Sequence, residues 1–212
     1  MADDQGFQHF PGALDRSAQL ALVQDVHHVL AEAPLYFPAM PRTGKLLSVR
    51  MTNCGALGWL TDKAGGYRYE PHHPATGRPW PPIPERLLAI WSQYGHYPAP
   101  PEACLINVYA ATAKLGSHRD EDELDKQAPV VSVSLGDDAV FHVGGVKRTD
   151  SKTRMTLKSG DIVVLGGAAR MAYHGIDKVL PGTSDLLAEG GRINLTLRRV
   201  TVPTASSRHA KR

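Results

Sequence analysis

Residues 129–136, PVVSVSLG, indicate the class of fold. Val131, Val133 and Leu135 alternate with two serines, and side chains that alternate in this way lie on opposite faces of a β-strand. Many short strands of this kind are typical of a sandwich or barrel. We therefore expect a mainly β protein (α+β) with a jelly-roll core in residues 100–200. Four more stretches share the two-residue period and are separated by Gly, Asp and Pro: 103–110, 139–145, 161–167 and 192–200.

Helices are expected only in the first half of the chain. Residues 17–33 carry apolar side chains at intervals of three and four, with Ser17 as the N-cap and Pro34 as the stop. A second helix, residues 85–95, follows a proline cluster, and Gly95 suits its C-terminal cap.

The composition is that of one globular domain. A chain of 212 residues with 42% hydrophobic and 21% charged residues can form one sizeable core. Its net charge of +3 permits an anionic partner such as nucleic acid without requiring one. Two cysteines make no disulfide framework. We expect no secretory signal, because the N-terminal residues are acidic and hold no apolar run, and no stretch has the length of a membrane span. We expect a cytoplasmic monomer with a disordered tail, residues 201–212.

A long segment between the expected helices, residues 40–82, is rich in Gly, Pro and Tyr. Loops of such length are usually functional or disordered. Its aromatic residues Trp59, Tyr67, Tyr69 and Trp80 argue against disorder, because their rings need something to pack on or bind.

Residues 117–123, SHRDEDE, raise the question of a metal site. A His-x-Asp pair arises by chance about as often as not in such a chain, so His118 and Asp120 alone fit a solvated acidic loop equally well. Two His and one carboxylate often hold iron(II) in oxygen-activating enzymes, with open positions left for reactants. His174, just after the strand-like residues 161–167, is the best-placed further ligand.

Polar side chains share one face on each of two expected strands. Buried charges need partners, and Arg is the natural bidentate clamp for a carboxylate. A dicarboxylate held beside an iron would explain both strands. The residues on these faces are Arg192, Asn194, Thr196 and Arg198 on one strand and Asn107 and Tyr109 on the other.

Seven stretches, in order, resemble the AlkB-type iron(II)/2-oxoglutarate-dependent dioxygenases: MTNCGALGW, ACLINVYA, SHRDEDE, PVVSVSLG, GGVKR, YHGI and RINLTLR. The resemblance implies a double-stranded β-helix (jelly-roll) core in residues 100–200 and a nucleotide-recognition lid in residues 46–82. Residues 1–45 form an N-terminal extension that matches no motif. The iron ligands and catalytic centre implied by the resemblance are His118, Asp120 and His174.

The same resemblance assigns the cosubstrate and substrate sites. It implies that Arg192 and Arg198 pair with the carboxylates of 2-oxoglutarate, helped by Asn107, Tyr109 and Asn194. An acidic run is unusual in a nucleic-acid binder, but it suits a base that is itself cationic, such as 1-methyladenine or 3-methylcytosine. The positions implied to line the base pocket or its approach are Trp59, Tyr67, Tyr69, Asp122, Glu123 and Arg148.

The activity implied is oxidative demethylation of N-alkylated bases in DNA, with RNA as a second candidate. Iron(II), 2-oxoglutarate and dioxygen are the cofactor and cosubstrates, and formaldehyde, succinate and CO2 are released. The methyl group lies inside a duplex, so the base must be flipped or single-stranded. Two alternatives stay open: the same oxygenase core acting on protein or small molecules, and a non-enzymatic β-sandwich that binds a metal or ligand.

Overall fold

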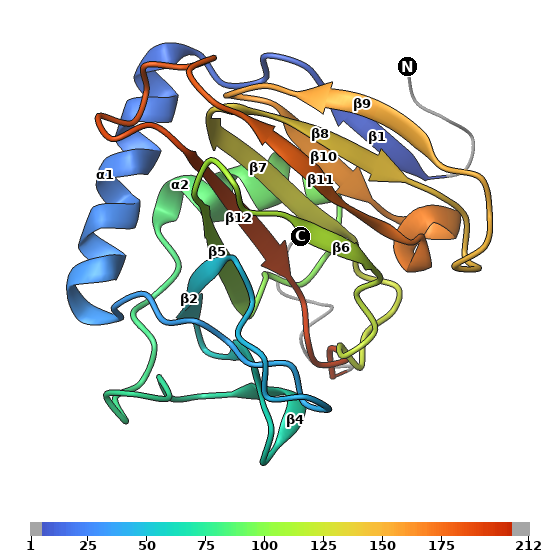
Figure 1. The fold of residues 1–212 in the computed structure, drawn as a ribbon. Coiled ribbons are helices and arrows are strands. Elements are labelled where there is room, and N and C mark those ends of the chain that lie inside the picture. The colour runs from blue at the N-terminus through green and yellow to red at the C-terminus, as the bar shows by residue number, and fades with distance from the viewer. Residues whose placement is uncertain (1–5, 205–212) are drawn as a thin grey trace.

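The strands form two sheets packed face to face and one separate hairpin (Figure 1). This computed structural model describes residues 6–204. Neighbouring strands are antiparallel throughout the described part, and the prediction of a mainly β fold is confirmed. The larger sheet has the order β1 (Phe7–Phe10), β10 (Ile162–Leu165), β7 (Val130–Gly136), β12 (Arg192–Arg198), β5 (Ala103–Tyr109) and β2 (Arg50–Gly55). The smaller sheet has the order β6 (Leu115–His118), β11 (His174–Leu180), β8 (Asp138–Val143) and β9 (Thr153–Leu157), and the hairpin consists of β3 (Gly58–Asp62) and β4 (Gly66–Glu70).

Strand β7 has one apolar face and one polar face, and both are covered. Val131, Val133 and Leu135 are completely buried in the main core, which also contains the apolar side chains of the two helices. Ser132, on the opposite face, lines a cavity between the two sheets. The helices therefore cover the apolar side of the larger sheet, and the smaller sheet encloses the polar side.

Helix α1 (Arg16–Glu32) begins earlier than predicted. Asp15, and not Ser17, is the N-cap, because its carboxylate accepts a hydrogen bond from the backbone N–H of Ala18 at 2.8 Å. Ser17 already lies inside the first turn. The helix ends before Pro34, as predicted.

Helix α2 (Glu85–Ile90) continues directly into a π-helical turn, Trp91–Gly95. The left-handed residue that ends it is His96, with φ of 47°, and not Gly95. Gly95 instead lies against the Trp91 ring, where a Cβ would approach the indole to 3.3 Å. The prediction of Gly95 as the cap was therefore wrong, because packing against Trp91 decides that position.

The larger sheet also uses strands from outside residues 100–200: β1 forms one edge and β2 the other. The burial of strand β11 does not alternate strictly along the chain, and its register against β8 shifts between Ile176 and Lys178. No helix within residues 6–204 is long and apolar enough to cross a membrane. Of the tail predicted to be disordered, residues 205–212 lie outside the described residues.

Candidate metal centre and active-site cavity

Strands β6 and β11 pair and bring two histidines together. His118 ends β6 and His174 begins β11, and the two residues are direct cross-strand partners with ring centroids 4.5 Å apart. Asp120 follows β6 after one residue, and one ligand atom from each of the three side chains lies within 4.8 Å of the others. The fold therefore assembles the three side chains that the sequence indicated as metal ligands.

Both histidines present the same nitrogen to the centre of this triad. The Nδ1 atoms of His118 and His174 each lie 3.0 Å from a backbone carbonyl, of Gly116 and Ala172 respectively. Because a carbonyl oxygen only accepts, each Nδ1 carries the hydrogen and each Nε2 keeps its lone pair. The two Nε2 atoms lie 3.9 and 3.8 Å from the Asp120 carboxylate.

The protonation states suit metal binding. Burial, with the neighbouring His118, lowers the pKa of His174 to about 4, so the ring is neutral at physiological pH. Burial alone would raise the pKa of Asp120, but the charge of Arg198 keeps this pKa below its ordinary range. Asp120 accepts from Arg198 Nη2 through Oδ1 at 2.7 Å, whereas its buried Oδ2 has no hydrogen-bond partner. Two imidazoles and a carboxylate with a free oxygen fit iron(II).

All three ligands line a cavity of about 420 Å³ between the sheets. Two residues that were expected in the base pocket or its approach, Tyr69 and Glu123, are not among its lining residues. The expected site residues that do line the cavity are Trp59, Tyr67, Asn107, Tyr109, Asp122, Arg148, Arg192, Asn194 and Arg198.

Two arginines of β12 bring positive charge into this cavity. Arg192 is 1% exposed and donates to the Ser134 hydroxyl at 2.7 Å and to the carbonyl of Asp137 at 3.2 Å. Within the described residues it forms no ion pair, and the Nε atoms of Arg192 and Arg198 are buried without hydrogen-bond partners. An uncompensated buried charge is strongly destabilising. The cavity is therefore suited to an anionic ligand such as a dicarboxylate.

Comparison with known proteins identifies the family of this site. The sequence profile of the 2OG-Fe(II) oxygenase superfamily matches residues 6–198. The α-ketoglutarate-dependent dioxygenase AlkB homolog of Caulobacter vibrioides is 51% identical over 92% of this chain and 87% of its own length. This chain belongs to the AlkB-type 2OG-Fe(II) oxygenases. The α-ketoglutarate-dependent dioxygenase AlkB of Escherichia coli is 43% identical over 84% of this chain and 83% of its own length.

The solved structure of OsALKBH1 supports the same assignment. It has a TM-score of 0.77 and 30% identity to this chain, and the match covers 94% of this chain and 100% of that one. The jelly-roll prediction is confirmed. As a member of this superfamily the chain is an iron(II)- and 2-oxoglutarate-dependent dioxygenase, and the non-enzymatic alternative is not favoured.

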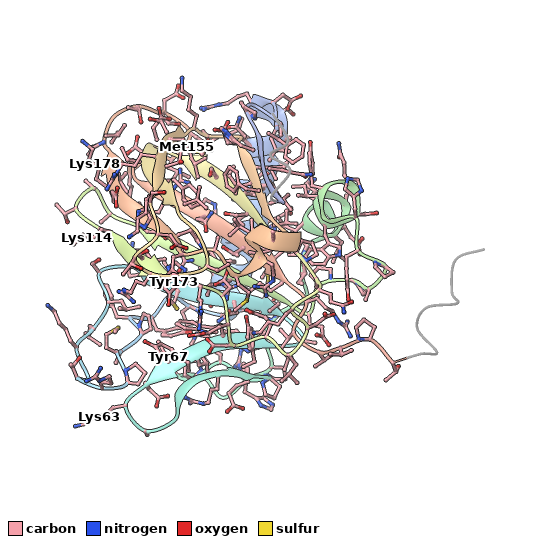
Figure 2. All side chains as sticks on the ribbon, turned by 90° about the vertical axis from the view of Figure 1, so that its right-hand side faces the viewer. Lys63, Tyr67, Lys114, Met155, Tyr173 and Lys178 are labelled. Atoms are coloured by element: carbon pink, nitrogen blue, oxygen red, sulfur yellow. The ribbon has the colours of Figure 1, made fainter. Side chains whose placement is uncertain are left out.

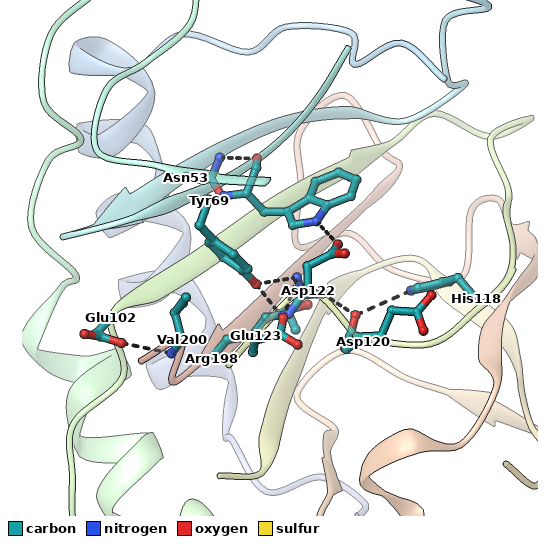
Figure 3. Close-up of polar contacts among 12 residues, drawn as sticks. Asn53, Tyr69, Glu102, His118, Asp120, Asp122, Glu123, Arg198 and Val200 are labelled. Carbon is teal, nitrogen blue, oxygen red and sulfur yellow. Dashed lines mark hydrogen bonds and ion pairs between the residues drawn. The ribbon is translucent and has the colours of Figure 1, made fainter. Parts of the chain in front are cut away.

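One side of the dioxygenase cavity is lined by two aromatic rings, and a carboxylate is hydrogen-bonded to one of them. Trp59, on β3, donates its indole N–H to Asp122 Oδ2 at 2.7 Å (Figure 3). The Trp59 ring stacks on Tyr67 of β4 with centroids 5.7 Å apart. Tyr67 is half exposed, at 50%. The hairpin therefore brings two stacked rings, and the loop after β6 brings one acceptor, to the space beside the metal ligands.

Tyr69 and Glu123 have a different environment from the one predicted. Glu123 is 2% exposed and accepts from the Tyr69 hydroxyl at 2.5 Å and from Arg170 at 2.9 Å. Burial raises the pKa of Tyr69 well above its usual value, so its hydroxyl remains a donor. Both oxygens of the Glu123 carboxylate therefore accept from protein donors, and neither Tyr69 nor Glu123 lines the cavity.

A pair of arginines lies at the rim of the cavity. The guanidinium groups of Arg119 and Arg148 lie over the ring of Tyr173, at 5.5 and 5.8 Å from its centroid. In Figure 2 Tyr173 lies on the same side of the molecule as Tyr67, and Lys63 marks the tip of the hairpin. This side therefore combines aromatic rings with cationic groups, as nucleic-acid binding surfaces do.

Sequence reasoning missed Arg170, which lies in a short 3-10 turn. It is 2% exposed and donates to the backbone carbonyls of Ala128 and Asp120 at 2.8 and 2.7 Å, besides Glu123. Nothing in the surrounding GGAARM sequence distinguishes it from a surface arginine. Its role depends on contacts with residues more than 40 positions away along the chain.

Proposed function

We propose that this dioxygenase removes methyl groups from N-alkylated bases of DNA, such as 1-methyladenine and 3-methylcytosine. The observation that supports this substrate most directly is Asp122, held by Trp59 at 2.7 Å in the cavity that contains the His-Asp-His triad. A planar cationic base would find an aromatic face and a negative charge there. Relatives named as DNA demethylases support an N-methylated DNA base but not its charge, because N(6)-methyladenine is neutral. One of them, a DNA N(6)-methyladenine demethylase of Arabidopsis thaliana, is 36% identical over 54% of this chain and 26% of its own length.

Each group in the cavity has a defined task in this reaction. His118, Asp120 and His174 would hold iron(II), which when bound supplies the centre where dioxygen is reduced and the methyl group is oxidised. Arg192 and Arg198 would bind the two carboxylates of 2-oxoglutarate. Their buried surroundings exclude water from the cosubstrate and strengthen these ion pairs.

The cosubstrate arginines are supported by a polar layer on the same strands. Asn194 donates to the Ser132 hydroxyl at 2.7 Å and accepts from Thr196 at 2.9 Å. The Oδ1 of Asn107, whose strand pairs with that of Asn194, is buried and has no partner among residues 6–204, and it would accept from a ligand donor or an ordered water. Tyr109 is the direct cross-strand neighbour of Arg192 and completes this layer.

Trp59, Tyr67 and Asp122 would hold the flipped base, and Arg148 would contact it or an adjacent phosphate. RNA as a second substrate and a monomeric state are part of the same proposal. So is a cytoplasmic location, where thiols such as the free Cys54 and Cys104 stay reduced.

The test is incubation with iron(II), 2-oxoglutarate and an oligonucleotide that carries 1-methyladenine, followed by mass analysis. We expect the loss of one methyl group together with succinate and formaldehyde. Asp120→Ala is the control and should give neither product. Succinate formation without any demethylation of a panel of alkylated oligonucleotides would instead favour the oxygenase acting on protein or small molecules.

A further inference from the structure

A chain of buried polar contacts joins the β3–β4 hairpin to the metal centre. The hydroxyl of Tyr69, on β4, donates to Glu123 Oε1 at 2.5 Å and accepts from Arg198 Nη1 at 3.1 Å. Arg198 in turn donates through Nη2 to Asp120 Oδ1 at 2.7 Å (Figure 3). The Tyr69 hydroxyl therefore connects the hairpin directly to Arg198, the residue that is hydrogen-bonded to the metal ligand Asp120.

The opposite side of this chain is fixed by Arg170. Its guanidinium donates to Glu123 Oε2 at 2.9 Å and to the backbone carbonyl of Asp120 at 2.7 Å. Glu123 lies 3.6 Å from Arg198. Two buried cations and two buried anions thus form one cluster. Tyr69 is the hairpin residue that contacts this cluster, and Tyr69→Phe removes its hydroxyl without removing a charge.

The cluster is charge-balanced within itself. Asp120 and Glu123 offset Arg170 and Arg198, and all four are at most 6% exposed. A cluster in such a low-dielectric site tolerates little change of geometry, because an unpaired charge there is strongly destabilising. Movement of the hairpin that withdraws the Tyr69 hydroxyl would therefore disturb Arg198, and through it the position of the Asp120 carboxylate.

We propose that Tyr69 and Glu123 are positioning residues that couple the hairpin to the cosubstrate and metal sites. When the hairpin closes on a base through Trp59 and Tyr67, Tyr69 fixes Arg198 in the orientation that binds 2-oxoglutarate and holds Asp120. Linkage then makes the coupling reciprocal, so a bound base strengthens 2-oxoglutarate binding and bound 2-oxoglutarate strengthens base binding. The base-dependent part of this inference rests on the proposed function.

The chain contains a matched control for Tyr69. Tyr97 also donates its hydroxyl to a buried carboxylate of the same loop, Asp125 Oδ2, at 2.7 Å. The other oxygen of Asp125 accepts from the backbone N–H groups of Gln127 and Ala128. Tyr69→Phe and Tyr97→Phe therefore each remove a hydroxyl that donates to a buried carboxylate, and the Tyr69 hydroxyl also accepts from Arg198.

The first measurement is calorimetric titration of 2-oxoglutarate into protein loaded with Mn(II), which replaces iron and permits no turnover. We expect Tyr69→Phe to weaken 2-oxoglutarate binding about three- to tenfold, the range of one lost hydrogen bond. Tyr97→Phe should leave the affinity within about twofold, even if both variants lose similar stability in urea. Equal affinities in the two variants would overturn the positioning role and leave Tyr69 a structural residue.

The second measurement repeats the titration with a 1-methyladenine oligonucleotide present. In the wild-type and Tyr97→Phe proteins the oligonucleotide should increase 2-oxoglutarate affinity, and in Tyr69→Phe this increase should be reduced. Glu123→Gln, which keeps the shape but leaves Arg170 and Arg198 with one carboxylate fewer, should lower stability in urea more than Tyr69→Phe and should also reduce this increase. An increase that Tyr69→Phe fully retains would contradict the coupling.

The two proposals fail in different ways. If the chain acts on another substrate, the oligonucleotide has no effect on any variant, but Tyr69→Phe still weakens 2-oxoglutarate binding. If only the coupling is wrong, the wild-type protein demethylates the oligonucleotide, and the oligonucleotide increases 2-oxoglutarate affinity equally in Tyr69→Phe and Tyr97→Phe.

Discussion

Replacing Asp122 with Asn tests whether the cavity recognises the charge of a base. The side chain keeps its shape, and the amide oxygen of Asn can still accept from the Trp59 indole N–H. In the wild-type protein this N–H lies 2.7 Å from Asp122 Oδ2. The fold of the hairpin should therefore survive. What is lost is the negative charge in the half-buried position beside the Trp59 and Tyr67 rings.

The expected magnitude follows from the second carboxylate oxygen, which would accept from the exocyclic amine of the base. In Asp122→Asn the one amide oxygen stays on the Trp59 N–H, so an NH2 donor replaces this second oxygen and the hydrogen bond to the base is lost. A hydrogen bond to a charged group contributes roughly 1.5–3 kcal/mol. Its loss corresponds to about ten- to a hundredfold in kcat/KM for cationic 1-methyladenine and 3-methylcytosine. A neutral lesion such as 1-methylguanine should lose much less.

The assay compares kcat/KM for the cationic and neutral lesions in wild type and Asp122→Asn, with formaldehyde as the product measured. Asp185→Asn changes the net charge equally at an exposed position paired only with Arg16, and serves as the control. Succinate formed without substrate should be unchanged, because the metal ligands are untouched. Equal losses on both lesion types, or no loss on either, would refute charge recognition by Asp122.

Three further predictions concern the buried groups. Asp120→Ala should abolish turnover and Mn(II) binding, measured by calorimetry, and should lower the free energy of unfolding in urea because buried Arg198 loses its partner; metal affinity at the wild-type level would exclude Asp120 as a ligand. Arg192→Ala should weaken 2-oxoglutarate binding by roughly 2–5 kcal/mol in the same titration, since one partner of a buried charge pair is removed; an unchanged affinity would remove Arg192 from the cosubstrate site. Burial lowers the pKa of His174 from 6.5 to about 4. Between these two pH values the unfolded state therefore binds more protons than the folded state. The free energy of unfolding of the metal-free protein should fall by about 3 kcal/mol as the pH is lowered through this window. Urea unfolding of wild type and His174→Gln at both ends of the window should show this loss in the wild type only.

The sequence by itself determined the strands whose side chains alternate and the residue types that the site needs. All five stretches with a two-residue period became strands, because alternation matches the geometry of a buried sheet directly. His118, Asp120 and His174 could be selected because their types and spacing suit iron(II). The seven motif stretches added the cosubstrate arginines, and both line the cavity.

The tertiary structure decided which polar residues face the cavity and which support it from behind. Asp122 and Glu123 are neighbours in one acidic run, yet the first lines the cavity and the second is buried against Arg170 and Tyr69. Nothing in the run separates them, because the difference arises from partners 54 and 47 residues away along the chain. Long-range pairing of charges in a buried site, and not local pattern, sets the role of each carboxylate.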